Sequence, residues 1–185
     1  MSEEFDSTIP TVFLSHTYTP STLGLQFIVA GTGGGVGTTT VAALLAVALT
    51  QRTGYAPRLG DHCGGTLTTR VQLIAQAGPH VVHDLGPHIP ALQELTEPSV
   101  CPVIVASADP YSMDIAESVA QRRHSLVICN HVHPGTDQLP HTIPPTTMVH
   151  LHWDPALARP GLVNPHDITM GTATSLEEIF HFFGI

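Results

Sequence analysis

Glycines and threonines gather in one short segment of this chain, directly after an apolar run. Residues 27–30 are apolar, residues 33–37 contain four glycines, and residues 38–40 are all threonine. The apolar stretch that follows, residues 41–49, is typical of a buried helix. A strand, a glycine-rich turn and a helix in this order place backbone N–H groups at a helix N-terminus, where they can bind phosphate oxygens. The pattern predicts a phosphate-binding loop.

Such a loop normally carries a lysine that contacts the terminal phosphates, and here that position is Thr38. The chain contains no lysine at any position. A charge-assisted hydrogen bond contributes roughly 1.5–3 kcal/mol, so its loss weakens nucleotide binding by about 10- to 100-fold. The glycines and Thr39 retain the backbone cradle and a hydroxyl suited to Mg²⁺. We therefore expect an anion site that is a poor catalyst; the alternative is a glycine turn that only packs strand against helix.

Three polar residues, Asp61, Asp84 and Asn130, follow or end expected strands. The carboxyl ends of parallel strands line the usual ligand crevice of such sheets. These side chains are therefore candidates to line the site, although each could also be a turn residue that ends its strand. None of the six arginines stands where it replaces the missing lysine. A working ATPase would need an arginine that folds back onto the loop.

Strands and helices alternate from residue 25 onward, which favours a parallel α/β sheet with both faces covered. We expect strands over 25–30, 57–60, 80–84, 102–106, 125–130 and 148–152. We expect helices over 39–52, 66–77 and 109–122, and a last helix that begins with a capping box from Ser175 to Glu178. Residues 1–22 are expected to form a tail, in which 11–14 could add an edge strand, and residues 23–185 a single domain.

The loop resembles the deviant Walker A motif of the ParA/MinD family of P-loop ATPases, CpaE-like members included. That motif reads Lys-Gly-Gly-Val-Gly-Lys-Thr-Thr, whereas residues 33–40 read Gly-Gly-Gly-Val-Gly-Thr-Thr-Thr, so both family lysines are absent. Residues 58–65 are similar to the family's second-strand motif, 81–87 to its Walker B strand, 127–130 to its adenine-contacting strand and 152–158 to a late Pro-x-Asp-x-x-Leu segment. The resemblance implies a three-layer α/β fold with a mostly parallel, doubly wound sheet.

The resemblance also implies roles for individual residues. Asn130 would contact adenine, Thr39 and Asp84 would hold Mg²⁺, and Asp61 would help to activate water. The implied nucleotide-binding residues are Gly33, Gly34, Gly35, Val36, Gly37, Thr38, Thr39, Thr40 and Asn130. The implied cofactor is ATP or ADP with Mg²⁺, bound weakly because both lysines are absent.

The resemblance and the missing lysines together predict a degenerate family member, a pseudo-ATPase rather than an enzyme. Such a protein would act through protein–protein contacts in chromosome or plasmid partitioning, cell division or positioning. The implied partners are other proteins, with a homodimer as one form. The first alternative is a weak but genuine ATP-binding and ATP-hydrolysing protein of the same type.

Histidines supply a second alternative, a metal-binding module. The chain has 13 histidines, and five of them, together with Cys63, fall at or just after expected strand ends: His62, His83, His131, His133 and His152. Imidazole and thiolate groups are ligands of Zn²⁺. No compact zinc-motif spacing occurs in the sequence, so this interpretation depends on the strand ends meeting at one edge of the sheet.

Charge argues against two classes of partner. Six basic residues against fifteen acidic ones give a net charge of −9, which disfavours direct nucleic-acid binding. The expected last helix carries Glu177 and Glu178 and no lysine or arginine, so insertion into an anionic membrane is not expected. The N-terminus is acidic and unlike a signal peptide, and we expect a cytoplasmic protein.

Overall fold

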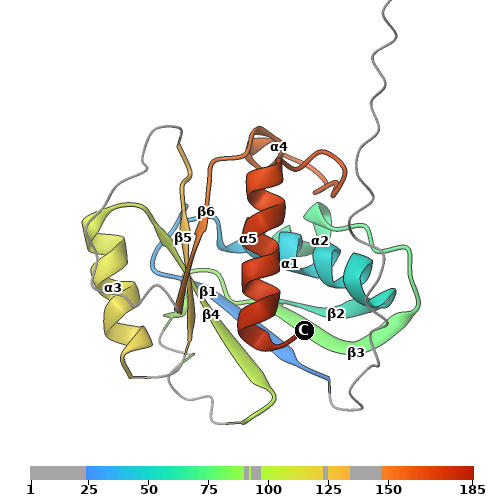
Figure 1. The fold of residues 1–185 in the computed structure, drawn as a ribbon, viewed down its shortest axis with the longest axis horizontal. Coiled ribbons are helices and arrows are strands. Elements are labelled where there is room, and N and C mark those ends of the chain that lie inside the picture. The colour runs from blue at the N-terminus through green and yellow to red at the C-terminus, as the bar shows by residue number, and fades with distance from the viewer. Residues whose placement is uncertain (1–23, 90–91, 93–96, 123–124, 134–146) are drawn as a thin grey trace, which may run out of the picture.

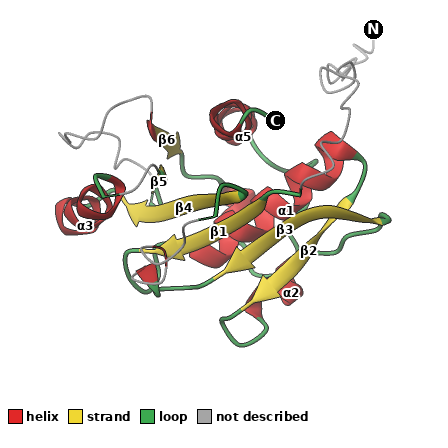
Figure 2. Ribbon diagram, turned by 90° about the horizontal axis from the view of Figure 1, so that it is seen from below, coloured by secondary structure: helices red, strands yellow, loops and turns green. Residues whose placement is uncertain are grey.

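The computed structural model describes residues 24–89, 92, 97–122, 125–133 and 147–185. The expected N-terminal tail and its edge strand over 11–14 lie outside these residues. One six-stranded sheet has the order β2-β3-β1-β4-β5-β6, and each neighbouring pair is parallel. Figure 2 shows β2, β3, β1 and β4 side by side.

The strands are β1 (Gln26–Gly31), β2 (Ala56–Asp61), β3 (Ala77–Asp84), β4 (Val100–Ser107), β5 (Leu126–Asn130) and β6 (Met148–Leu151). The helices are α1 (Thr38–Thr53), α2 (Thr66–Arg70), α3 (Pro110–Ala120), α4 (Pro155–Ala158) and α5 (Met170–Phe183). All six expected strands are present, and α1 and α3 lie where the sequence predicted helices.

Helices cover both faces of the sheet, because successive strand residues point to opposite faces and both sets are apolar. One buried cluster joins α1, α2 and α5 to side chains such as Phe27 and Val82, and the other joins α3 to side chains such as Ile28 and Val127. Figure 1 shows α3 and α5 on opposite sides of the strands. The predicted three-layer α/β fold is confirmed, and the sheet is parallel throughout the described residues.

Helix α2 ends much earlier than the predicted limit at residue 77. It stops at Arg70, and Val71 already has extended backbone angles. The carbonyl of Arg70, which a longer helix would use for its next turn, accepts a hydrogen bond of 2.9 Å from the N–H of Val163. A contact with a distant segment therefore ends this helix.

Helix α5 begins before the predicted capping box. Its N-cap is Thr169, whose side chain accepts a hydrogen bond from the N–H of Thr172. Ser175 lies inside the helix, and its hydroxyl donates to the carbonyls of Gly171 and His150. The capping-box prediction was wrong, because Ser175 joins the helix to β6 instead of starting it. None of the described helices has the length and apolar character needed to cross a membrane.

Candidate phosphate-binding site

The glycine-rich loop connects β1 to α1 and is anchored to strands on both sides. The N–H of Gly31 donates to the carbonyl of Gly86, just after β3, at 2.7 Å. The N–H of Thr32 donates to the carbonyl of Val105, in β4, at 2.9 Å. The loop therefore lies at the carboxyl ends of three adjacent strands, where the chain order in the sheet reverses and ligands of open α/β sheets usually bind.

The loop presents a run of unused backbone donors. Within the described part of the chain, no residue accepts a hydrogen bond from the N–H groups of residues 33–40. Gly35 and Gly37 have φ angles of 80° and 90°, which bend the backbone in a way that other residues rarely adopt. These amides stand at the start of a 16-residue helix, whose dipole adds positive potential. The arrangement suits an anion such as a phosphate group.

The predicted cradle residues differ in how far they reach solvent. Gly34 and Gly35 are exposed; Val36 and Thr38 are buried; Gly33, Gly37, Thr39 and Thr40 are half-buried. A Cβ built on Gly31 would lie 2.2 Å from the Oγ1 atom of Thr38. The side chain at the position of the missing lysine therefore lies against the backbone of Gly31, at the base of the loop.

Asn130 lies at the end of β5 and contacts the loop itself. Its buried side-chain amide donates to the carbonyl of Val36 at 2.9 Å. A Cβ on Gly37 would lie 2.3 Å from the same nitrogen. Asn130 thus holds the loop in place through contacts that need glycine at position 37. The predicted contact of Asn130 with adenine stays a prediction.

Asp84 ends β3 with a fully buried carboxylate, 0% exposed. Its Oδ1 atom accepts a hydrogen bond of 2.9 Å from the N–H of Gly86. Its Oδ2 atom is buried and has no hydrogen-bond partner among the described residues. An unpaired buried oxygen of this kind calls for an explanation such as a bound ion. Carboxylate and hydroxyl oxygens are the ligands that Mg²⁺ prefers, so Asp84 and Thr39 fit the predicted metal site chemically.

Cys63 lies against the same carboxylate. Its Sγ atom is 3.6 Å from the Oδ1 atom of Asp84. Burial, followed by the charge and hydrogen bond of Asp84 and the charge of Asp61, raises the pKa of the Cys63 thiol to about 11. The protonated thiol therefore donates to the carboxylate, and Cys63 is a poor nucleophile at neutral pH.

Asp61 uses its carboxylate to close the turn after β2. Its Oδ1 atom accepts from the N–H groups of Cys63 and Gly65 at 2.9 and 3.2 Å. Its Oδ2 atom accepts from Leu67 and Thr68 at 2.7 and 3.2 Å. Burial opposes ionisation of Asp61, but these four hydrogen bonds outweigh it and lower its pKa. A carboxylate offers about four acceptor positions, so this geometry favours the turn-forming role of Asp61 over the predicted activation of water.

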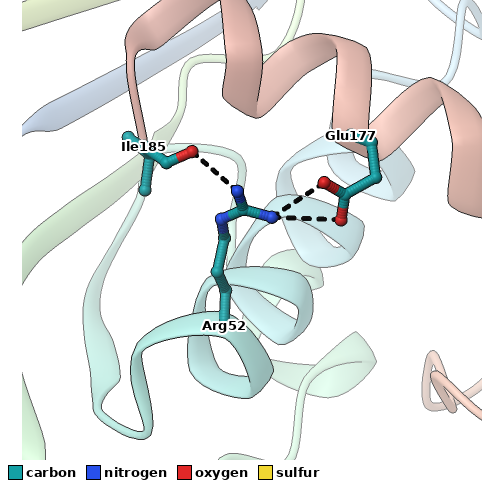
Figure 3. A network of polar contacts seen from close by, with 3 residues as sticks. All are labelled: Arg52, Glu177 and Ile185. Carbon is teal, nitrogen blue, oxygen red and sulfur yellow. Dashed lines mark hydrogen bonds and ion pairs between the residues drawn. The ribbon is translucent and has the colours of Figure 1, made fainter. Parts of the chain in front are cut away.

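Two arginines are held by hydrogen bonds away from the loop. Arg52 contacts Glu177 and Ile185, as Figure 3 shows. It lies near the far end of α1, about 22 Å from the loop at 1.5 Å per residue. Arg70 donates to the carbonyl of Leu157 at 3.0 Å. Neither side chain replaces the cation missing at Thr38.

The six predicted rim ligands do not form one group among the described side chains. His62 directly follows β2 and precedes Cys63 in the chain. Its Nε2 atom lies 3.2 Å from the Nδ1 atom of His83 in β3. His131 and His152 stack at β5 and β6 with ring centroids 5.2 Å apart, and His133 is exposed nearby in the sequence. Strands β1 and β4 separate β3 from β5, a gap of about 14 Å at roughly 4.8 Å per strand.

Burial lowers the pKa of His83, and the neighbouring His62 and Arg58 lower it further. His83 is therefore neutral at physiological pH.

The sequence analysis missed Cys129 and His150, which lie beside His131. The sequence did contain a signal for these ligands, since Cys129 and His131, and likewise His150 and His152, are two residues apart. Alternate residues of a strand share a face.

No protein-family model matches the chain, and no curated protein matches it. Among solved structures, it is similar to a nucleotide-binding protein from Archaeoglobus fulgidus in complex with ADP, with Co found by PIXE. The TM-score is 0.50 at 15% identity, over 87% of this chain and 92% of the other. A ParA family ATPase from Chlorobium tepidum TLS matches with a TM-score of 0.42 at 15% identity, over 65% of this chain and 77% of the other. The first match shows that the two proteins share an α/β fold.

Proposed function

We propose that this protein binds the phosphates of ADP or ATP at residues 33–39 and hydrolyses ATP poorly or not at all, as a ParA/MinD-like pseudo-ATPase. One observation carries the proposal: no described residue accepts a hydrogen bond from the backbone N–H groups of the loop, while Thr38, in place of lysine, lies against Gly31. The fold shared with a protein solved in complex with ADP supports a nucleotide as the ligand.

Binding would depend on the backbone amides and the potential of α1 rather than on a side-chain cation. Thr39 and Asp84 would hold Mg²⁺, which neutralises phosphate charge when it is bound. The N–H of Gly86 orients the Asp84 carboxylate through a hydrogen bond. The hydrogen bond from Asn130 to Val36 holds the loop against the end of β5. These residues would position phosphates without a mobile ammonium group.

Poor hydrolysis follows from two absent functions. No lysine exists in the chain to stabilise charge on the transferred phosphoryl group, and loss of such a contact costs on the order of 10²–10³ in rate. Asp61 has its acceptor positions filled by four backbone amides, which leaves it unsuited to activate water. A protein of this kind would act by binding protein partners in partitioning, division or positioning, and not by hydrolysing ATP.

A thermal-shift series with ADP, ATP and buffer, each with and without Mg²⁺, tests the binding proposal. Nucleotide at 100 times its Kd should add about 2.7 kcal/mol to the free energy of unfolding. Thr39→Ala and Asp84→Asn should remove the Mg²⁺-dependent part of this stabilisation. Thr174→Ala, an exposed threonine on α5, is the matched control and should leave it unchanged. Wild-type protein that no nucleotide stabilises would show the proposal to be wrong.

Restoring the cation gives an independent test. Thr38→Lys should tighten ATP binding by about 10- to 100-fold, because it returns one charge-assisted hydrogen bond. Circular dichroism must first show that the variant folds, since Thr38 is buried. Mg²⁺-dependent ATP hydrolysis by the wild type that Asp84→Asn abolishes would instead support the weak-ATPase alternative.

A further inference from the structure

A second group of chemistry-bearing side chains lies at the β5–β6 edge, away from the phosphate loop. The Nε2 atom of His131 is 3.0 Å from the Nδ1 atom of His150 and 3.9 Å from the Sγ atom of Cys129. All three potential ligand atoms lie within 4.8 Å of one another. Cys129 and His131 are buried and His150 is half-buried.

The strand pairing itself brings these side chains together. Cys129 and His150 are direct cross-strand partners in the β5–β6 ladder. His131 extends that ladder, because its N–H donates to the carbonyl of Leu151 at 2.8 Å. Cys129 and His131 are two residues apart and so point to the same face. The backbone therefore positions three ligands with no further movement of the strands.

The spacing of the atoms has two chemical explanations. Two ring nitrogens 3.0 Å apart share either a proton or a cation, because two lone pairs at that distance repel each other. Around a tetrahedral Zn²⁺, bond lengths of about 2.0–2.1 Å to nitrogen and about 2.3 Å to sulfur place neighbouring ligand atoms roughly 3.3–3.6 Å apart. The observed nitrogen–nitrogen separation of 3.0 Å is slightly shorter than this range, and the observed nitrogen–sulfur separation of 3.9 Å is slightly longer.

The donor set decides which cations would fit. One thiolate and two imidazoles suit Zn²⁺ and similar borderline transition metals, whereas Mg²⁺ and Ca²⁺ require oxygen ligands. Three protein ligands leave one tetrahedral position for a water molecule or another group. His150 is the least buried of the three ligands and marks the side from which an ion would enter.

We infer that Cys129, His131 and His150 form a binding site for Zn²⁺ or a closely similar divalent transition metal, which clamps β6 to β5. Strand β6 has only four residues and lies at the edge of the sheet, so a clamp there would add stability. The site is distinct from the phosphate loop: Asn130, between two of the ligands, points to the opposite face and contacts Val36. Metal binding should therefore be independent of nucleotide.

Cobalt provides the direct test, because tetrahedral Co²⁺ bound to thiolate has characteristic visible and near-ultraviolet absorption. Full-length protein without a histidine tag, purified without chelating resin and treated with a chelator, would be titrated with Co²⁺ and then Zn²⁺. We expect one Co²⁺ per chain with a thiolate-to-cobalt charge-transfer band, displaced by one equivalent of Zn²⁺. Added Zn²⁺ should also raise the melting temperature.

Variants locate the site among the many histidines. His150→Gln and Cys129→Ser should each weaken Co²⁺ binding by about 100-fold or more, since even changes to groups around the ligands cost 10- to 100-fold. The matched controls are His62→Gln, from the other histidine pair, and Cys101→Ser, from the neighbouring buried strand; both should bind normally. Circular dichroism checks that Cys129→Ser is folded, and His150→Gln tests the site without altering a fully buried residue.

Two results would overturn the inference: wild-type protein with no thiolate-to-cobalt band, or a band that His150→Gln leaves intact. Thr39→Ala and Asp84→Asn should not change Co²⁺ binding. If they abolish it, the metal belongs to the phosphate site and the proposed β5–β6 site is wrong, while the nucleotide proposal is unaffected.

Discussion

The side-chain amide of Asn130 donates a hydrogen bond of 2.9 Å to the backbone carbonyl of Val36, joining the end of β5 to the middle of the phosphate loop. The two residues are 94 positions apart in the chain. Since both residues are buried, the bond is shielded from water. If the Asn130 amide were removed, water could not easily replace it as the donor to the Val36 carbonyl.

Asn130→Ala should therefore destabilise the protein by about 1–3 kcal/mol, the cost of leaving a buried acceptor unpaired. It should also weaken nucleotide binding, because the loop loses its tie to β5. Urea denaturation measures the first effect and calorimetric titration the second. Asn164→Ala is the control, since Asn164 makes an exposed hydrogen bond to Asp167 and its loss should change stability by less than about 0.5 kcal/mol. If Asn130→Ala and Asn164→Ala changed stability and nucleotide binding equally, Asn130 would not be the residue that holds the loop to β5.

Gly31→Ala should be far more harmful than Gly33→Ala. A Cβ on Gly31 would lie 2.2 Å from Thr38 Oγ1, whereas one on Gly33 would meet no atom of the described residues within 4 Å. Overpacking at the buried position should cost about 1–3 kcal/mol. Thermal and chemical denaturation of both variants check this, and a Gly31→Ala protein as stable as Gly33→Ala would mean that Thr38 does not pack as described.

Arg52 joins the end of α1 to α5 through three different contacts. It pairs with Glu177 at 2.9 Å, donates to the carbonyl of Ile185 and lies 5.2 Å from the centroid of the Phe180 ring. The carboxylate is 48% exposed, so the ion pair alone is worth about 0–1 kcal/mol. Glu177→Gln should therefore have a small effect at low salt and none at high salt.

Arg52→Ala should cost more than Glu177→Gln, by about 0.5–1 kcal/mol for the aromatic contact, and this excess should persist in high salt. Denaturation at two ionic strengths separates the two contributions. A loss that disappears completely in high salt would show that Arg52 acts through charge pairing alone.

Asp154 connects the starts of α4 and α5. Its Oδ1 atom accepts from the N–H of Ala156, and its Oδ2 atom accepts from Thr169 and Thr172. Burial raises its pKa, but hydrogen bonds from Thr172, Thr169 and Ala156 outweigh burial and lower the pKa below its ordinary value of 3.8. Because the pKa is lowered in the folded state, the carboxylate adds stability above pH 3.8 and loses it as the pH falls through the folded-state pKa.

Asp154→Asn should therefore cost about 1.5–3 kcal/mol at neutral pH, as expected for hydrogen bonds to a charged group. The difference from wild type should stay constant down to about pH 5 and shrink in more acidic solution. Denaturation curves across this range give the measurement, with the exposed Asp167→Asn as the control for removing one carboxylate. A difference that grows in acid would contradict the assigned direction.

Local patterns predicted most of the elements, and the two misplaced helix ends have non-local causes. Residues 39–52 form a helix because an apolar run lies between two glycines, at positions 37 and 54, that can adopt positive φ angles. In contrast, the N–H of Val163 ends α2 at Arg70, and Thr169 rather than Ser175 begins α5. Both depend on segments that meet only in the folded chain.

The amino-acid order alone determined the chemistry available at the loop: consecutive glycines after a buried strand, a helix behind them and no lysine. These are properties of neighbouring residues, which local backbone preferences express directly. Only the tertiary structure decided that Asn130 supports the loop and that Cys129 lies beside His150. It also decided that one buried oxygen of Asp84 has no hydrogen-bond partner among the described residues. Strand order and register bring those groups together, and both arise from packing between segments far apart in the sequence.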